Sequence, residues 1–500
     1  MNLKHSLHPP ASPARRAAPP GWRLAALAGL VAVLGGCASP GSSTPRAQLL
    51  GGQQLGLQAG AAVFPAEDWW KHFGDPGLDR LEQQALAGSP GLQQAQARER
   101  EAQAATGIAR SALLPHVGAA LSTTRERFSA NDIYPPPLGG STYTENQLAL
   151  QGSWDLDFFG RNQARLRAAV GQARAAQAQA QAARVMITSD VAAEYFRLAG
   201  LVAQERVLHD SLAQRKTTAR LVGERARAGL DNTLQQRQAQ AQIPQLRVSL
   251  EANLQAQQQA RDALAALIGA GPQATAGLHP QLRHVPLPRL PRSLPASLIG
   301  RRPDVVAARW QVQSALASVD AARASFYPDI NLSAFVGFTS LGFSQFLAAG
   351  SRAWGVGPAI DLPIFEGGAL RANLRARDAG ADAAIDEYNA TLVGAVREVA
   401  DAVAQRRSAQ AQIHAQQRAL QLASQAHRLA RDRFDAGLGN ELMVLQTQEP
   451  VLQLRQLGAQ LKTQALVDDV ALIRALGGGY GAGHEAGAPA AAVPVSTTAR

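Results

Sequence analysis

Among the side chains that could do chemistry, Cys37 stands apart because it is the only cysteine of the chain. It follows an uncharged apolar run over residues 24–36, which basic residues precede. As a helix this run would rise only about 20 Å, too short for a hydrocarbon core of ~30 Å. The pattern predicts a secretory signal peptide over residues 1–36. A single thiol excludes an intramolecular disulfide, so the chemistry to consider at Cys37 is acylation.

The residues directly before Cys37 are Leu34, Gly35 and Gly36. They resemble a bacterial lipobox, whose small residues give a peptidase access to the bond before a diacylated cysteine. We therefore expect a covalent lipid on Cys37 and no other cofactor. By resemblance to Gram-negative lipoproteins, Ser39 in place of aspartate favours the outer membrane over the inner one. The alternative is a lone cysteine within an apolar anchor.

Residue types found in catalytic sites occur at His209, Asp210, Ser211 and His284. No nucleophile elbow, metal-ligand spacing or phosphate loop accompanies them, so we expect neither catalytic residues nor a metal site. The formal net charge is +11, but the charges are interspersed rather than clustered. Nucleic acid is therefore not an expected partner.

Two helix breaks of similar sequence contain Gly229 with Asn232, and Gly437 with Asn440. Each glycine permits the left-handed conformation that ends a helix, and each asparagine can cap the next helix. Each break is therefore predicted to be a tight turn between two helices. A plain helical hairpin with no role in gating is the alternative interpretation.

Other segments recur with nearly the same offset as the two breaks, which predicts an internal two-fold repeat. For example, "SWDLDFFGR" at residues 153–161 is similar to "AIDLPIFEGG" at residues 359–368. The predicted organisation is a lipidated tether over 37–66, a first repeat over 67–290, a second repeat over 291–476 and a disordered tail over 477–500.

Long helices are predicted over residues 161–228 and 369–435, which contain no proline. At ~1.5 Å per residue, each would span about 100 Å. A helix of this length needs neighbours along its whole length, as in a coiled coil.

Alternating segments predict four strands, at about 113–128, 142–159, 326–339 and 353–365. Apolar residues such as Leu148, Leu150 and Trp154 share one face of their strand, and polar residues occupy the other. This alternation is typical of membrane β-barrel strands, although any single strand could equally belong to a half-buried hairpin. Four strands cannot close a barrel with a lumen, and open edges in lipid cost several kcal/mol for each unpaired group. We therefore expect a barrel shared between chains.

Several segments resemble the TolC-like outer membrane factor family, and most closely its lipoprotein branch, which serves resistance-nodulation-division efflux pumps. The similarity runs from about residue 67 to 480. It is carried by "DWWKHFGDPGLDRLEQQAL" (68–86), "RRPDVVAARW" (301–310), "ASFYPDINLSAFVGF" (324–338) and "GPAIDLPIFEGGAL" (357–370).

This resemblance implies an α+β membrane protein. Three chains would form a 12-stranded outer-membrane β-barrel, with four strands from each, continued by a long periplasmic α-helical barrel. The implied function is passive efflux of drugs, toxic compounds or metals through a gated tube. The implied partners are outer membrane lipid, a periplasmic adaptor protein and an inner-membrane resistance-nodulation-division pump.

By the same resemblance, the two turns lie at the periplasmic tip, where the tube is narrowest. Spacing from Gly437 assigns the gate leucine to Leu442. Met443 and Gln446 stand where relatives often carry aspartate, and Gln235 is their counterpart after Gly229. We expect Leu442 and Met443 to close the tip by apolar packing, with help from Arg433 and Phe434.

Three rival functions remain at this stage. The first is the outer channel of a type I protein secretion system, which shares the fold. The second is an enzyme, which the absence of catalytic motifs disfavours. The third is a cytoplasmic coiled-coil scaffold, against which the signal peptide and the alternating strands count.

Overall fold

The computed structural model describes residues 44–56, 65–282 and 301–480. The predicted signal peptide, Cys37 and most of the predicted tail lie outside these residues. The described residues are mainly helical and include one sheet of four strands, which confirms the predicted α+β class and the number of strands. Within this part of the chain, no helix is both long and apolar enough to cross a membrane.

The element bounds are as follows. The helices are α2 (Pro76–Gly88), α3 (Pro90–Ser111), α4 (Arg161–Arg227), α5 (Thr233–Leu267), α6 (Pro303–Ala324), α7 (Ala369–Asp435) and α8 (Glu441–Ala475). The strands are β1 (His116–Arg127), β2 (Thr142–Asp155), β3 (Asp329–Leu341) and β4 (Arg352–Asp361). Short 3₁₀ turns include η1 (Gly52–Leu55) and η2 (Trp69–Phe73).

The described chain divides into two compact units. A sheet unit comprises Ala109–Leu166 and Ala317–Gly380, and a helical unit comprises Arg46–Ile108, Arg167–Leu316 and the residues from Ala381 onward.

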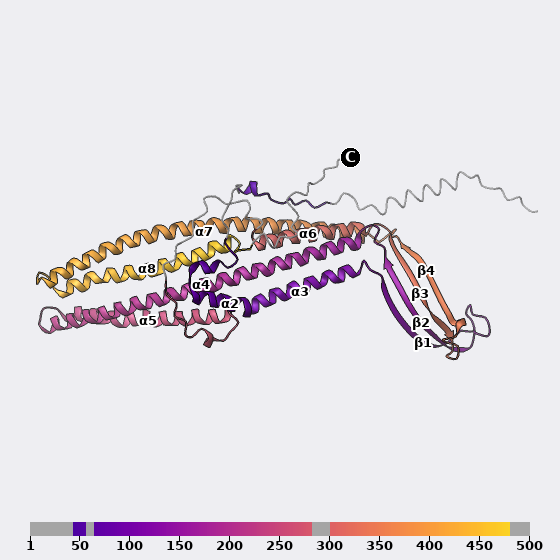
Figure 1. Ribbon diagram of the computed structural model, residues 1–500, viewed down its shortest axis with the longest axis horizontal. Helices are drawn as coiled ribbons and strands as arrows, with labels where there is room; N and C mark the ends of the chain where they lie inside the picture. Colours follow the sequence, from indigo (N-terminus) through magenta and orange to yellow (C-terminus); the bar gives the residue numbers. More distant parts are fainter. Residues whose placement is uncertain (1–43, 57–64, 283–300, 481–500) are drawn as a thin grey trace, which may run out of the picture. The chain divides into compact units, whose positions relative to one another are not determined.

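In the sheet unit, the strands form an antiparallel meander in the order β1-β2-β3-β4 (Figure 1). The register pairs Leu150 with Val336, and Val336 with Trp354, so apolar side chains of three strands share one face. Trp354 on this face is 76% exposed. The opposite face carries mostly polar or small residues, such as Gln151 and Ser333. The predicted apolar and polar faces therefore extend across the whole sheet.

The strands begin later than the sequence suggested where a preceding helix continues. The N–H groups of Leu113 and Leu114 bond back to α3, so β1 starts at His116 instead of near residue 113. The N–H groups of Phe326 and Tyr327 likewise bond back to α6, which delays β3.

Two strands also end earlier than expected. The Asp155 carboxylate accepts the N–H of Asp157, whose φ of 45° is incompatible with a strand, so β2 ends at Asp155 rather than near 159. β4 ends at Asp361 rather than near 365, before Pro363, which has no N–H to donate.

The helical unit contains two antiparallel helix pairs, α4 with α5 and α7 with α8 (Figure 1). α4 and α8 approach closely, because a Cβ added at Gly200 would lie 2.0 Å from Thr463 Oγ1. The largest apolar core forms where η2 and α2 cover α4, α5 and α8, and it includes Trp69, Phe73, Phe196 and Leu264.

Polar links tie α8 to both of its neighbours. Arg406 of α7 forms an ion pair with Asp469 of α8, and both side chains are buried. On the α4 side, Gln214 Nε2 donates to the Leu445 carbonyl at 2.8 Å. Breaking a buried pair such as Arg406–Asp469 leaves an uncompensated charge, so these contacts fix the register of α8.

Glu82 of α2 is a buried carboxyl group in this unit. Neither of its carboxylate oxygens has a hydrogen-bond partner among the described residues. Burial, with a smaller contribution from the nearby Asp79 carboxylate, raises the pKa of Glu82 to about 9. The group is therefore protonated at neutral pH when the chain is folded.

We predict that Glu82→Gln stabilises the protein increasingly as the pH rises. The unfolded chain ionises Glu82 near pH 4.5, whereas the folded chain keeps it protonated up to about pH 9. Stability from this group is therefore complete below pH 4.5 and declines as the pH rises toward 9, by up to about 1.4 kcal/mol per pH unit. Denaturant unfolding of both proteins at pH 5 and pH 8 measures the difference, and a gap that does not change with pH contradicts the prediction.

Candidate functional site

The two turns predicted from the sequence have nearly the same backbone. Gly229 and Gly437 both have a φ of 73°, and no atom lies within 4 Å of a Cβ added to either. The N–H of Leu230 bonds the Arg225 carbonyl at 2.9 Å, and the N–H of Leu438 bonds the Arg433 carbonyl at 2.8 Å. This is the Schellman pattern of a helix end, and glycine is needed there for its conformation alone.

The asparagine caps differ between the turns. The Asn232 side chain accepts the N–H of Gln235 at 3.0 Å, and the Gln235 side chain accepts the N–H of Asn232 at 3.1 Å. Asn440 accepts the N–H of Met443 at 2.9 Å, but a methionine side chain cannot complete the reciprocal pair. The first turn therefore has a full capping box and the second has half of one.

The first turn also carries an ion pair that sequence reasoning missed. Arg225 makes two hydrogen bonds to the Asp231 carboxylate, at 2.8 and 3.1 Å. By the offset that relates Gly229 to Gly437, Gly439 occupies the position of Asp231. Arg433, the counterpart of Arg225, has no side-chain partner among the residues that the structure describes. An alignment of the two breaks places Asp231 opposite Gly439, and this difference in charge could have revealed the ion pair.

The other predicted gate residues lie in or beside these turns. Leu442 is half-buried, whereas Met443 is 51% exposed and Gln446 is also exposed, all in the first turns of α8. Gln235 is exposed, and Phe434 is 38% exposed at the end of α7. The structure joins Gln235 to Asn232 and Met443 to Asn440. Among the described residues, the Gln446 side chain forms no hydrogen bond, and Leu442 and Phe434 offer only apolar side chains.

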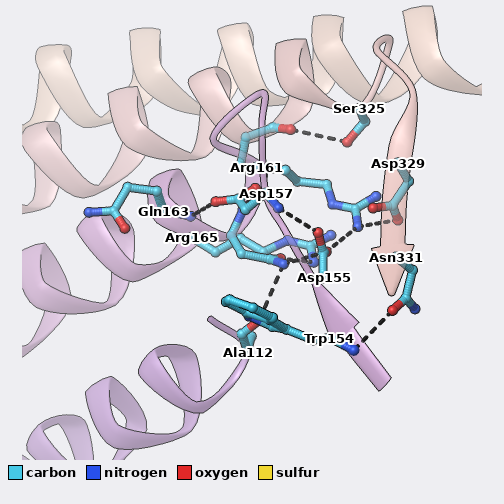
Figure 2. Close-up of polar contacts among 12 residues, drawn as sticks. Ala112, Trp154, Asp155, Asp157, Arg161, Gln163, Arg165, Ser325, Asp329 and Asn331 are labelled. Atoms are coloured by element: carbon cyan, nitrogen blue, oxygen red, sulfur yellow. Dashed lines mark hydrogen bonds and ion pairs between the residues drawn. The ribbon is translucent and has the colours of Figure 1, made fainter. Parts of the chain in front are cut away.

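A second polar cluster lies in the sheet unit, where β2 passes into α4 (Figure 2). Arg161 Nη2 donates to the carboxylates of Asp155, at 3.0 Å, and Asp329, at 2.6 Å. Asn162 Nδ2 also donates to Asp155, at 2.6 Å. One guanidinium group therefore links the end of β2, the start of β3 and the start of α4.

Asp157 caps the same helix. Its carboxylate accepts the N–H groups of Asn162 and Gln163, at 2.9 and 2.7 Å (Figure 2). Trp154 completes the junction, since its indole N–H donates to the Leu113 carbonyl at 3.0 Å. The two N–H groups that Asp157 satisfies belong to the unpaired first turn of α4, so the junction sets where the helix begins.

The second repeat lacks this cluster. Counting from Asp155 and its counterpart Asp361, Asp157 corresponds to Pro363 and Arg161 to Gly367. The arginine-centred junction therefore forms after β2 and has no counterpart after β4. The similarity of the two segments predicted a repeat but not these contacts.

We predict that Arg161→Leu weakens the sheet unit, because it leaves the Asp155 and Asp329 carboxylates without their shared cation. The expected loss is about 1–3 kcal/mol, with Arg161→Lys intermediate because lysine provides charge but no planar fork. Thermal loss of the β circular dichroism signal in detergent measures it. Arg174→Leu, which removes an exposed arginine of α4 bonded to the neutral Gln177, is the control. Equal melting of the two leucine variants would contradict the assignment.

The chain is similar to known outer membrane efflux proteins in sequence. The family model for outer membrane efflux proteins matches residues 81–270 and 294–478. The chain is 38% identical over 360 residues to the fusaric acid resistance protein FusA of Burkholderia cepacia, covering 70% of this chain and 68% of that one. It is 30% identical over 476 residues to the multidrug resistance outer membrane protein MdtP of Escherichia coli K12, covering 92% and 97%.

A solved structure agrees with these sequence matches. The outer membrane protein VceC of Vibrio cholerae superposes with a TM-score of 0.77 at 35% identity, covering 84% of this chain and all of that one. The family predicted from the sequence is confirmed. The chain belongs to the outer membrane efflux protein family and is an outer-membrane component of an efflux system.

Proposed function

We propose that three copies of the chain form one outer-membrane channel, whose barrel contains four strands from each copy. The observation that carries this proposal is the four-stranded antiparallel sheet with one exposed apolar face. Within the described residues, β1 pairs only with β2, and β4 pairs only with β3. In lipid, their outer edges require partners from other chains, because each unpaired backbone group costs several kcal/mol.

The number of copies follows from the number of strands. Two copies would give eight strands, and a barrel of that size has an interior that side chains fill. Three copies give 12 strands, with room for an aqueous lumen lined by the polar face of the sheet. An efflux conduit needs that lumen.

The helices would extend the channel across the periplasm. α4 and α7 each contain 67 residues, which rise about 100 Å. Paired with α5 and α8, they would give each chain two similar segments of an α-helical barrel. The internal two-fold repeat would then make a three-chain tube approximately six-fold.

The cargo would be small toxic molecules. The names of FusA and MdtP associate those proteins with fusaric acid resistance and multidrug resistance. By similarity to them, this chain would conduct such compounds passively, without catalysis. It would receive them from a periplasmic adaptor and an inner-membrane resistance-nodulation-division pump. The alternative is a type I protein secretion system.

The anchor would be a lipid on Cys37, which holds the channel at the outer membrane in addition to its barrel. The support for it comes from the apolar run and the small residues that precede Cys37 in the sequence.

The periplasmic gate would be formed by the turn before α8. Leu442 and Met443 of three chains would close the tip by apolar packing, with Arg433 and Phe434 beside them. Rings of Met443, Gln446 and Gln235 carry no charge. The tip would therefore attract cations only weakly, because an acidic ring is what gives a narrow pore affinity for them.

We predict that Met443→Asp creates a divalent-cation block. Three carboxylates in a narrow ring would bind a divalent ion, so half-block should require at least about tenfold less cation than in the wild type. Single-channel recordings in planar bilayers measure this. Met186→Asp, at a similarly exposed methionine of α4, is the control. Strong block of the wild type that Met443→Asp does not alter would place the selectivity ring elsewhere.

Crosslinking tests the proposed partner. Leu438 is 72% exposed at the second turn, so a photoreactive residue there should capture the adaptor of a resistance-nodulation-division pump in cells. The same probe at Leu422, an equally accessible position within α7, should capture it much less. Capture of the adaptor of a protein exporter at residue 438 would favour the alternative function.

A further inference from the structure

An extended segment near the N-terminus lies along α7 in the helical unit. The N–H groups of Arg46 and Ala47 both donate to Asp382 Oδ1, at 2.6 and 2.8 Å. The N–H of Leu50 donates to Asn389 Oδ1 at 2.9 Å, and Asn389 Nδ2 donates to the Gln48 carbonyl at 2.9 Å. Two side chains of one helix thus satisfy four backbone groups of this segment, residues 46–50, which we call the strap.

The spacing of the two side chains suits an extended chain. Asp382 and Asn389 are seven residues apart, so they lie on one face of α7 and about 10 Å apart along its axis. An extended chain covers that length in about three residues, which matches the separation of Ala47 and Leu50. These hydrogen bonds therefore recognise the backbone of the peptide and do not depend on its side chains.

Apolar contacts complete the docking. Ala47, Leu50 and Leu55 pack against a core cluster of α6 and α7. The cluster comprises Val305, Ala308, Val312, Ile385, Tyr388, Leu392 and Ala395. Arg46 and Gln48 are exposed, whereas Ala47 is half-buried, so the start of the strap alternates between cluster and solvent. Polar clamps at two points and apolar contacts between them are the features of a peptide-binding groove.

We propose that this surface of α6 and α7 is a binding site for an extended peptide and that its occupant is the chain's own strap. By holding the strap, Asp382 and Asn389 position the N-terminal anchor. Residues 37–46 reach at most about 30 Å when fully extended. A docked strap therefore confines the group attached to Cys37 to that radius around Asp382. The positioning role rests on the proposed lipid anchor, whereas the groove itself does not.

Limited trypsin digestion of the full-length protein in membranes tests the proposal. Arg46 is the only trypsin site between Cys37 and Lys71, and the cleaved bond lies between the two residues bound to Asp382. A protease needs the segment undocked, so cleavage follows the population of the open strap. We expect wild-type protein to be cut slowly, and Asp382→Ala and Asn389→Ala to be cut at least about tenfold faster. A new N-terminus at Ala47, measured by mass spectrometry, reports the cut.

The conservative variants make the test specific to the hydrogen bonds. Asp382→Asn keeps an acceptor for the two N–H groups and should be cut nearly as slowly as wild type. Asn389→Asp keeps the acceptor for Leu50 but cannot donate to Gln48, and should be cut fast. Asp386→Asn, at an exposed position between the clamps, is the control. The melting temperature of the helical unit should be the same in all variants. Equal cutting of wild type and Asp382→Ala overturns the proposal, as does a cutting rate that only follows melting temperature.

The released fragment, residues 37–46, separates this inference from the proposed anchor. A fragment that carries acyl chains supports both. A fragment without acyl chains, released faster from Asp382→Ala than from wild type, removes the anchor and its positioning while the peptide groove stands. An acylated fragment released equally from both proteins overturns the groove and leaves the anchor intact.

Discussion

Backbone hydrogen bonding at the two outer edges of the sheet is the constraint on which the proposed channel depends. β1 and β4 each have a partner on one side only among the described strands. The exposed apolar face over three strands is suited to contact with lipid. Lipid, however, offers no hydrogen bonds to an open sheet edge. In the proposed channel, other copies of the chain pair with these edges. In the same proposal, α4 and α7 pack against helices of neighbouring copies, because a helix of 67 residues needs contacts along its whole length.

The two halves of the chain share a backbone plan but differ in their polar contacts. Both turns use a left-handed glycine and an asparagine cap. The first turn adds the Arg225–Asp231 ion pair and the Gln235 capping box, which the second lacks. Arg161 after β2 also binds Asp155 and Asp329, whereas Gly367 stands at the corresponding position after β4. The two turns thus share a backbone geometry, while the polar groups around them differ.

Local patterns in the sequence predicted the elements well. The long helices end at Arg227 and Asp435, beside the two glycines that mark the breaks. The two faces of the sheet followed from alternation with period two, because the register carries the same alternation across neighbouring strands. Strand ends were less accurate, since they depend on side chains such as Asp155 and Asp157 that compete for the backbone.

Contacts between distant segments were not predictable in the same way. No local periodicity in the sequence relates the residues that make these contacts. Examples are the burial of Glu82, the ion pair of Arg406 with Asp469, and the docking of the strap on Asp382. Each needs the fold before the partners can be named. An alignment of the two halves could have shown only that the second turn has no residue equivalent to Asp231.

The most direct test of the central claim is the mass of the protein extracted from membranes in mild detergent, measured by native mass spectrometry. An open four-stranded sheet completed by identical copies predicts three chains in each particle. A particle of one or two chains that still conducts ions in bilayers would contradict the shared barrel.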